Sequence, residues 1–175
     1  MFLTDFDNGI VIPFNLEVKT KNRTNILVAG GIGVAPLVFL AQELSKLKRN
    51  DNLILLGAKN SKEIVCEKEL KSLGFKIKIA TEDGSKGTKG TVIKLLDKEL
   101  AKSNKQIYIY ACGPKEMFSA INRKIKKLPK IRCEVSFEQF MGCGLGVCCA
   151  CSIKTKKGYK KTCKDGPVFN IKDIW

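Results

Sequence analysis

The sequence predicts an α/β protein with a parallel sheet, followed by a small cysteine-rich segment. Short apolar runs alternate with stretches of helical periodicity between residues 25 and 126. Strands and helices that alternate in this way are typical of a parallel sheet covered by helices on both faces. After residue 129 the alternation stops, and five of the eight cysteines fall between residues 143 and 163.

Length and composition limit the other classes of protein. The 175 residues suffice for one solid core, or for a domain of about a hundred residues with a small appendage. No apolar run approaches the roughly 20 residues that a membrane span needs, and the sequence shows no signal peptide, so we expect a soluble, cytoplasmic protein. The net charge of +15 comes mostly from scattered lysines, without a stripe of alternating basic and aromatic residues. This pattern favours a generally positive surface over a nucleic-acid partner.

The first 22 residues do not form a complete structural unit. Residues 10–12 and 14–18 have the composition of strands and are separated by Pro13. Nothing else in this stretch could pair with them to bury an apolar face. We therefore interpret residues 1–22 as the end of a unit that is otherwise missing.

The regular alternation begins with an apolar strand at residues 26–29, a glycine-rich turn, and a helix to about residue 47. Such a turn presents N–H groups and the positive end of a helix to an anionic phosphate. Gly31 and Gly33 permit a close approach, and Pro36 fits the first helical turn, where its missing N–H costs nothing. Close packing of strand against helix would demand the same glycines, so the motif alone leaves both interpretations open.

Three further strands and three helices continue the pattern. We expect the strands at residues 53–56, 75–80 and 106–111, and the helices from Ser61, as N-cap, to residue 73, over residues 91–102 and over residues 115–126. Gly57, residues 81–83 and residues 112–114 each follow a strand. Ligands on parallel sheets lie beyond the carboxyl ends of the strands, so these turns together predict a nucleotide crevice.

Four cysteines near the end of the chain have the spacing of iron–sulfur ligands. They are Cys143, Cys148, Cys151 and Cys163. A C-x4-C-x2-C motif with a more distant fourth cysteine is the plant-type arrangement for a [2Fe–2S] cluster. Gly142, Gly144 and Gly146 allow the loop to fold closely around such a group. A hairpin formed by residues 150–154 and 159–162 would bring Cys163 back to the loop.

The remaining cysteines and the rival kinds of site fit less well. A zinc site more usually contains histidines or two C-x2-C pairs, and the chain has no histidine, which also excludes a Rieske centre. A disulfide framework would need an oxidising compartment. Cys149 is interpreted as a non-ligand because only Cys148 preserves both spacings. Cys66, Cys112 and Cys133 are most simply buried thiols.

These motifs resemble the ferredoxin-reductase family. Residues 31–36 and 112–114 look like its two pyridine-nucleotide motifs. Residues 133–144 and 163–169 are similar to the iron–sulfur end of the electron-transfer subunit of class B dihydroorotate dehydrogenase. The resemblance covers residues 25–175. It implies a ferredoxin-reductase-type nucleotide-binding domain followed by a small C-terminal [2Fe–2S] domain.

The resemblance also implies domain limits. We expect a nucleotide-binding domain at residues 23–128 and a cluster domain at residues 129–175, with the apolar tail from residue 168 docked. Relatives carry an N-terminal barrel of roughly a hundred residues that holds most of the FAD, of which residues 1–22 could be only the last strand and a linker. This chain alone is therefore not expected to bind FAD tightly or to turn over NADH.

The family relays electrons. Its subunit exchanges a hydride at FAD and passes electrons singly through the [2Fe–2S] cluster to an FMN-containing catalytic subunit, which oxidises dihydroorotate to orotate in pyrimidine biosynthesis. The resemblance thus implies NAD, FAD and a [2Fe–2S] cluster as cofactors, and a heterotetramer with the FMN-containing subunit. A nicotinamide exchanges two electrons at once and the cluster takes one, so a flavin must stand between them. No catalytic side chain is expected in this chain.

The nucleotide contacts implied by the resemblance are Gly31, Gly33, Pro36, Gly57, Asp83, Cys112, Gly113, Pro114 and Met117. The turn at residues 31–36 would face the pyrophosphate, and residues 112–114 would lie near the nicotinamide. Cys112 and Met117 are equally well explained as core residues. Glu82 could lie at the ribose or adenine end, and Lys59 could favour a 2′-phosphate, although NAD is the expected nucleotide.

Two alternative functions remain at this stage. One is the related small subunit of NADH-dependent ferredoxin:NADP oxidoreductases or of sulfhydrogenases, which share the layout; residues 134–138 favour the dihydroorotate system. The other is a non-enzymatic module that binds nucleotide or metal. The expected lack of the FAD-binding barrel is the reason to retain this alternative.

Overall fold

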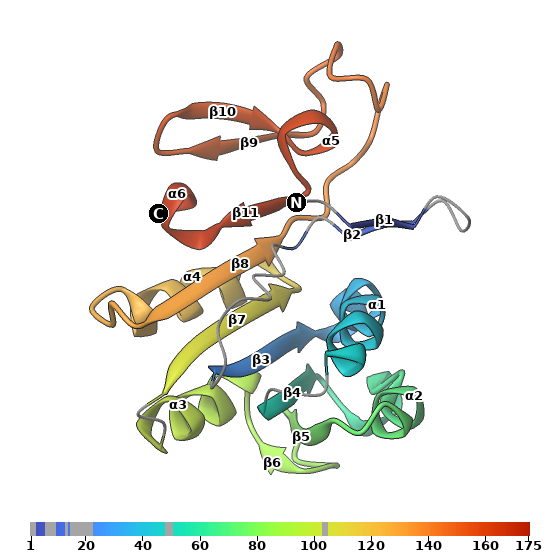
Figure 1. Cartoon of the computed structure of the whole chain (residues 1–175), viewed down its shortest axis with the longest axis vertical. Coiled ribbons are helices and arrows are strands. Elements are labelled where there is room, and N and C mark those ends of the chain that lie inside the picture. Colours follow the sequence, from blue (N-terminus) through green and yellow to red (C-terminus); the bar gives the residue numbers. More distant parts are fainter. Residues whose placement is uncertain (1–2, 6–9, 13, 15–22, 48–50, 103–104) are drawn as a thin grey trace.

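The computed structural model describes residues 3–5, 10–12, 14, 23–47, 51–102 and 105–175. Its body is a seven-stranded sheet flanked by helices (Figure 1). The strands, in spatial order, are β11 (Val168–Asn170), β8 (Ile131–Ser136), β7 (Gln106–Cys112), β3 (Arg23–Gly30), β4 (Asp51–Ala58), β5 (Lys76–Thr81) and β6 (Thr88–Lys89). All neighbours in this sheet are parallel except β11, which is antiparallel to β8.

Helices cover both faces of the sheet, as the alternation predicted. The longer helices are α1 (Val34–Lys46), α3 (Val92–Lys102) and α4 (Lys115–Ile125), and the shorter ones are α2 (Glu67–Ser72), α5 (Thr162–Asp165) and α6 (Ile171–Ile174). Leu27 and Ala29 of β3 pack with α1 and α2, whereas Ile26 and Val28 pack with α3 and α4. The central strand is therefore apolar along its length because both of its faces are buried.

Two small antiparallel hairpins lie outside the sheet. The first pairs β1 (Leu3–Asp5) with β2 (Ile10–Ile12), which confirms the strand at residues 10–12. Residues 15–18 of the second predicted fragment lie outside the described residues. The second hairpin pairs β9 (Ser152–Thr155) with β10 (Gly158–Lys161), which confirms the predicted hairpin before Cys163.

The predicted helix from Ser61 to residue 73 is wrong. The structure has a single 3-10 turn, η2 (Ser61–Glu63), and then the separate helix α2. Asn60, rather than Ser61, caps η2 by accepting a hydrogen bond from the N–H of Lys62 at 3.0 Å. Between the two elements Ile64 packs against the core in an extended conformation, and Cys66 adopts a positive φ of 60°. Core packing thus interrupts the helical pattern.

The expectation that the alternation stops after residue 129 is also wrong. β8 pairs in parallel with β7, so β7, α4 and β8 form one more βαβ unit. Ile131, Cys133 and Val135 are buried on one face of β8, while Arg132 and Glu134 lie on the other. Because polar and apolar residues alternate along β8, its sequence lacks the continuous apolar run of the other strands. The docking of the apolar tail is confirmed, because Ile171 is fully buried beneath the sheet and Trp175 stacks on Phe137.

Among the described residues, the elements η1 (Gly31–Gly33), β1, β6, α5, β11 and α6 were also not predicted. Among the thiols, Cys112 and Cys133 are buried as expected, whereas Cys66 is only half-buried. None of the helices in the described ranges is long and apolar enough to cross a membrane.

Replacing Gly33 with alanine should destabilise the fold. A Cβ atom there would lie 2.4 Å from the carbonyl oxygen of Cys112, and rigid backbone cannot yield as a side chain would. We expect the free energy of unfolding to fall by about 2 kcal/mol, measured by urea denaturation. Gly74→Asn is the control, because Gly74 has open space and a positive φ of 80° that asparagine tolerates. Equal denaturation midpoints for Gly33→Ala and the unchanged chain would contradict this interpretation of Gly33.

Candidate functional site

A crevice of about 680 Å³ opens at the carboxyl ends of the parallel strands. It begins at Gly113 and Pro114 after β7 and crosses the glycine turn after β3. It continues past Gly57, near the carboxyl end of β4, and reaches Glu82 after β5. The crevice therefore crosses four adjacent strand ends, which is where nucleotides bind on sheets of this type.

Its glycines have two different roles. A Cβ atom on Gly30 would lie 2.7 Å from Cδ of Pro114, and one on Gly33 would meet the backbone of Cys112. These two glycines permit the turns after β3 and β7 to touch. Gly31 instead has a positive φ of 56° and nothing within 4 Å of the position of its Cβ, so it leaves the backbone open to the crevice. Both interpretations of the glycine motif thus apply, at different positions.

Six of the nine predicted nucleotide residues line the crevice: Gly31, Gly33, Gly57, Gly113, Pro114 and Met117. The other three do not. Pro36 lies in the first turn of α1 and is exposed, and Cys112 is fully buried in the core. The carboxylate of Asp83 accepts hydrogen bonds from the N–H and the hydroxyl of Ser85, at 2.9 and 2.7 Å. These hydrogen bonds lower the pKa of Asp83, so its role is within its own loop.

Several residues that line the crevice were not identified from the sequence as nucleotide contacts. Glu63 and the first turn of α3 form part of its wall at one end, and Glu138 lies at the other. The thiol of Cys112 donates a hydrogen bond to Oε1 of Glu138 at 3.6 Å. Burial, followed by the charge of Glu138, raises the pKa of Cys112 to about 12. A contact between residues so far apart in sequence leaves no local signal, although Glu138 belongs to the run that carried the resemblance.

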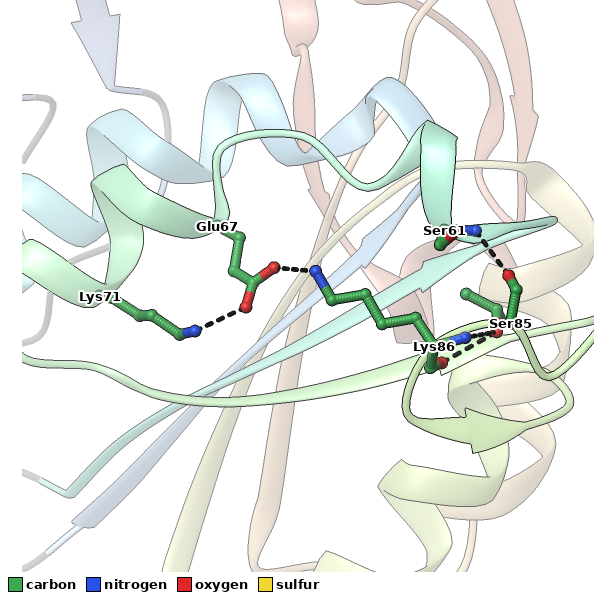
Figure 2. Close-up of polar contacts among 6 residues, drawn as sticks. Ser61, Glu67, Lys71, Ser85 and Lys86 are labelled. Atoms are coloured by element: carbon green, nitrogen blue, oxygen red, sulfur yellow. Dashed lines mark hydrogen bonds and ion pairs between the residues drawn. The ribbon is translucent and has the colours of Figure 1, made fainter.

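The loop after β5 is held against η2 and α2 by a set of polar contacts, which we call the clasp (Figure 2). The N–H of Ser61 donates to the hydroxyl of Ser85 at 2.8 Å. Glu67 lies between Lys71 and Lys86 and forms an ion pair with each. The buried hydroxyl of Thr81 exchanges hydrogen bonds with the backbone of Lys86, at 2.9 and 3.0 Å. The clasp thereby fixes the end of the crevice that contains Glu82.

The second candidate site is the cysteine loop, where backbone N–H groups converge on sulfur. Sγ of Cys143 accepts hydrogen bonds from the N–H groups of Leu145, Val147 and Cys148, at 3.4, 3.3 and 3.4 Å. These donors stabilise the thiolate and lower the pKa of Cys143 to about 6. A loop that presents amide donors to a thiolate is suited to bind a metal cluster through sulfur.

The four predicted ligands are arranged as two pairs. Sγ of Cys148 accepts a hydrogen bond from the N–H of Cys143 at 3.3 Å, and Sγ of Cys151 accepts one from the N–H of Cys163 at 3.5 Å. The pKa of Cys163 is raised, first by its hydrogen bond to Cys151 and also by the charges of Cys151 and Cys143. The two cysteines of each pair therefore lie near one another. Two pairs fit a two-iron cluster, in which each iron takes two thiolates and two bridging sulfides.

A single zinc ion would instead need four ligands around one point. In the part of the chain that the structure describes, no three cysteine, aspartate or glutamate side chains are grouped so as to hold one metal ion. Cys149 has a positive φ of 61°, and its thiol donates to the carbonyl of Val147 at 3.7 Å rather than to another cysteine. This geometry supports the interpretation of Cys149 as a non-ligand.

The glycines of the cysteine loop are needed for different reasons. Gly144 and Gly146 have positive φ angles of 68° and 79°, as expected for a tight loop. Gly142 is different, since a Cβ atom there would lie 2.8 Å from Sγ of Cys148.

Thr162, which the sequence analysis did not identify, is fully buried and donates its N–H and hydroxyl to the carbonyl of Cys151, at 3.1 and 2.9 Å. Thr162 thus ties Cys151 to the segment that carries Cys163.

Comparisons with known proteins match two parts of the chain. A model of the oxidoreductase NAD-binding domain matches residues 27–123, more than half of the chain. The chain belongs to this family. A model of the iron–sulfur cluster binding domain of dihydroorotate dehydrogenase B matches residues 138–175, which include all four predicted ligands. The expected fold, an NAD-binding domain with a C-terminal iron–sulfur segment, is therefore confirmed.

The curated proteins most similar to this chain include electron transfer subunits of dihydroorotate dehydrogenase B (NAD(+)). The subunit from Caldanaerobacter subterraneus subsp. tengcongensis is 36% identical over 158 residues, covering 88% of this chain and 60% of the relative. That from Desulforamulus reducens is 39% identical, covering 82% of this chain and 55% of the relative. The chain therefore spans somewhat more than half the length of these relatives.

A solved structure shows the same architecture. The NADH-dependent reduced ferredoxin–NADP oxidoreductase, described in connection with flavin-based electron bifurcation, superposes with a TM-score of 0.76 and 29% sequence identity. The match covers 87% of this chain and 54% of that one. The chain that contains the nucleotide crevice and the cysteine loop is therefore similar in structure to this oxidoreductase.

Adjacent cysteines provide a sharp test of the proposed ligands. Cys148→Ser should abolish cluster assembly, because it removes one thiolate of a pair, whereas Cys149→Ser should retain close to the full iron content. Iron and acid-labile sulfide, measured in anaerobically prepared protein, report the difference. Loss of the cluster in Cys149→Ser with retention in Cys148→Ser would mean that the ligand set is wrong.

The clasp should respond to acid. Hydrogen bonds from Lys71 first and then from Lys86 lower the pKa of Glu67. Because the pKa in the folded chain lies below the unfolded value of about 4.3, the stabilisation is complete above that pH and is lost as the pH falls through the folded value. We expect an NMR titration of the Glu67 carboxyl carbon to have its midpoint below 4.3 by a measurable margin, and Lys71→Gln to raise it. A midpoint unchanged by Lys71→Gln would contradict this account.

Proposed function

We propose that this chain is the electron-transfer subunit of a class B dihydroorotate dehydrogenase. It would relay electrons between NAD(H), FAD and a [2Fe–2S] cluster to an FMN-containing catalytic subunit that oxidises dihydroorotate, in a heterotetramer. The observation that supports this most directly is the continuity of the two sites. β8 belongs to the nucleotide-binding sheet and is followed within seven residues by Cys143, so a short segment of chain joins the two sites.

Each part of the chain has a distinct task in this proposal. The six crevice residues identified above would contact the nucleotide, and Cys143, Cys148, Cys151 and Cys163 would hold the cluster. When bound, flavin converts the two-electron chemistry of the nicotinamide into single electrons, which the cluster carries. The protein's own residues would bind the nucleotide and the cluster and orient them. Cys112 remains protonated at neutral pH because of its raised pKa, so it contributes no charge beneath the crevice.

The division of the chain follows the same proposal. Residues 23–128 would form the nucleotide-binding domain, and the cluster domain would extend over residues 129–175, with β8 shared through the sheet. FAD would need a further domain. The extra length of the curated relatives leaves room for such a domain.

The solved oxidoreductase supports a second candidate. Its similarity over most of this chain also suits a small subunit of an NADH-dependent ferredoxin:NADP oxidoreductase. The two candidates share the cluster and the crevice, and they differ in the partner. Copurification with an FMN-containing protein that oxidises dihydroorotate would separate them.

The first experiment is metal analysis with electron paramagnetic resonance. Anaerobically prepared chain should contain about two irons and two acid-labile sulfides, and should show an S = 1/2 signal after dithionite reduction. Stoichiometric zinc without this signal, in protein never exposed to oxygen, would contradict the relay and leave a nucleotide-binding or structural module.

A further inference from the structure

The order of the strands indicates where each part of a bound nucleotide would lie. This step rests on the proposed function. If the nicotinamide lies at the end of β7 and the pyrophosphate at the glycine turn after β3, the adenosine ribose falls beyond β4 and β5. That end of the crevice is lined by Gly57, Lys59, Glu63, Glu82 and the first turn of α3.

Two of the three charged side chains at this end are acidic. The carboxylate of Glu63 accepts hydrogen bonds from the N–H of Lys59 at 3.3 Å and from Nδ2 of Asn60 at 3.1 Å. A 2′-phosphate would use such donors, and here an internal carboxylate already occupies them. With Lys59, Glu63 and Glu82 together, the formal charge at this end is −1.

The position of Glu82 is set by contacts on both sides of its loop. Its N–H donates to the carbonyl of Ala58 at 3.1 Å, and the N–H of Asp83 donates to the carbonyl of Lys59 at 3.2 Å. The clasp then holds the remainder of the loop, through Ser85 on Ser61 of η2 and through Lys86 on Glu67 of α2 (Figure 2). Since η2 also contains Glu63, one network positions both carboxylates.

We infer that Glu63 and Glu82 select nucleotides with a free 2′-hydroxyl on the adenosine ribose, and that the clasp residue Ser85 is a positioning residue for this selection. A ribose 2′-hydroxyl donates a hydrogen bond to a carboxylate, which favours binding. A 2′-phosphate brings negative charge beside two carboxylates and finds the nearby backbone donor occupied, so it is disfavoured. Specificity here includes a repulsive element as well as an attractive one.

The test compares two probes that differ only in the 2′-phosphate. ADP-ribose and ADP-ribose 2′-phosphate are titrated into the full chain by isothermal calorimetry. The chain should bind ADP-ribose at least about tenfold more tightly than the phosphorylated probe. Equal affinity for both would overturn the inference and leave the nucleotide site intact. Binding of neither probe would overturn the proposed nucleotide site itself.

Variants then assign the selection to residues. Glu63→Gln removes the charge but keeps an acceptor, and should lower the ratio of the two affinities about tenfold, mainly through tighter binding of the phosphorylated probe. Glu69→Gln is the matched control, since Glu69 is exposed on α2 away from the crevice, and should leave the ratio unchanged. A ratio that Glu63→Gln does not alter would overturn the assignment to Glu63.

Ser85 is tested by removal and rescue. Ser85→Ala removes the acceptor for the N–H of Ser61 and should lower the ratio about threefold, whereas Ser85→Thr keeps the hydroxyl and should restore it. A purely structural role would weaken both probes equally and leave the ratio unchanged. That outcome, or a failure of threonine to restore the ratio, would overturn the positioning role.

Discussion

The close contact between the turn after β3 and the turn after β7 determines where both sites of this protein lie. Gly33 packs so tightly on the carbonyl of Cys112 that no side chain fits between them. Because these strands are neighbours at the centre of the sheet, the contact aligns two turns along one crevice. The same strand β7 continues through α4 into β8, and β8 leads to the cysteine loop. A single packing constraint thus relates the nucleotide end of the chain to its cluster end.

The two ends differ in how their functional groups are held. At the crevice, the backbone itself forms most of the surface, and the side chains that matter lie on short loops fixed by hydrogen bonds. At the cysteine loop, the N–H groups of Leu145 and Val147 donate to Sγ of Cys143, while their side chains are 79% and 77% exposed. A loop that directs its N–H groups inward has to direct side chains outward, so exposed apolar residues here follow from the way the loop binds sulfur.

Local patterns in the sequence were sufficient for most of the fold. The strands at residues 26–29, 53–56, 75–80 and 106–111 are all present, because each is an apolar run bounded by turns. β8 was not predicted as a strand of the sheet. Only one of its faces is buried, and Arg132 and Glu134 on the other face interrupt the apolar run that marks the other strands. The break between η2 and α2 could not be predicted either, because it depends on how Ile64 packs against a core that the sequence does not display.

The same distinction explains what could be predicted of the sites. The spacing of the cysteines is a local signal, and the four cysteines fall within the range matched by the iron–sulfur family model. Asp83 looked like a nucleotide ligand because it follows a strand, yet its carboxylate is used by Ser85. Glu63 lies in a stretch that reads as a helix and gave no such signal, yet it lines the crevice. Which acidic residues line the crevice depends on contacts between η2 and the loop after β5. Such contacts join segments more than twenty residues apart, so the end of the crevice that would meet the adenosine ribose is defined by tertiary structure rather than by a motif.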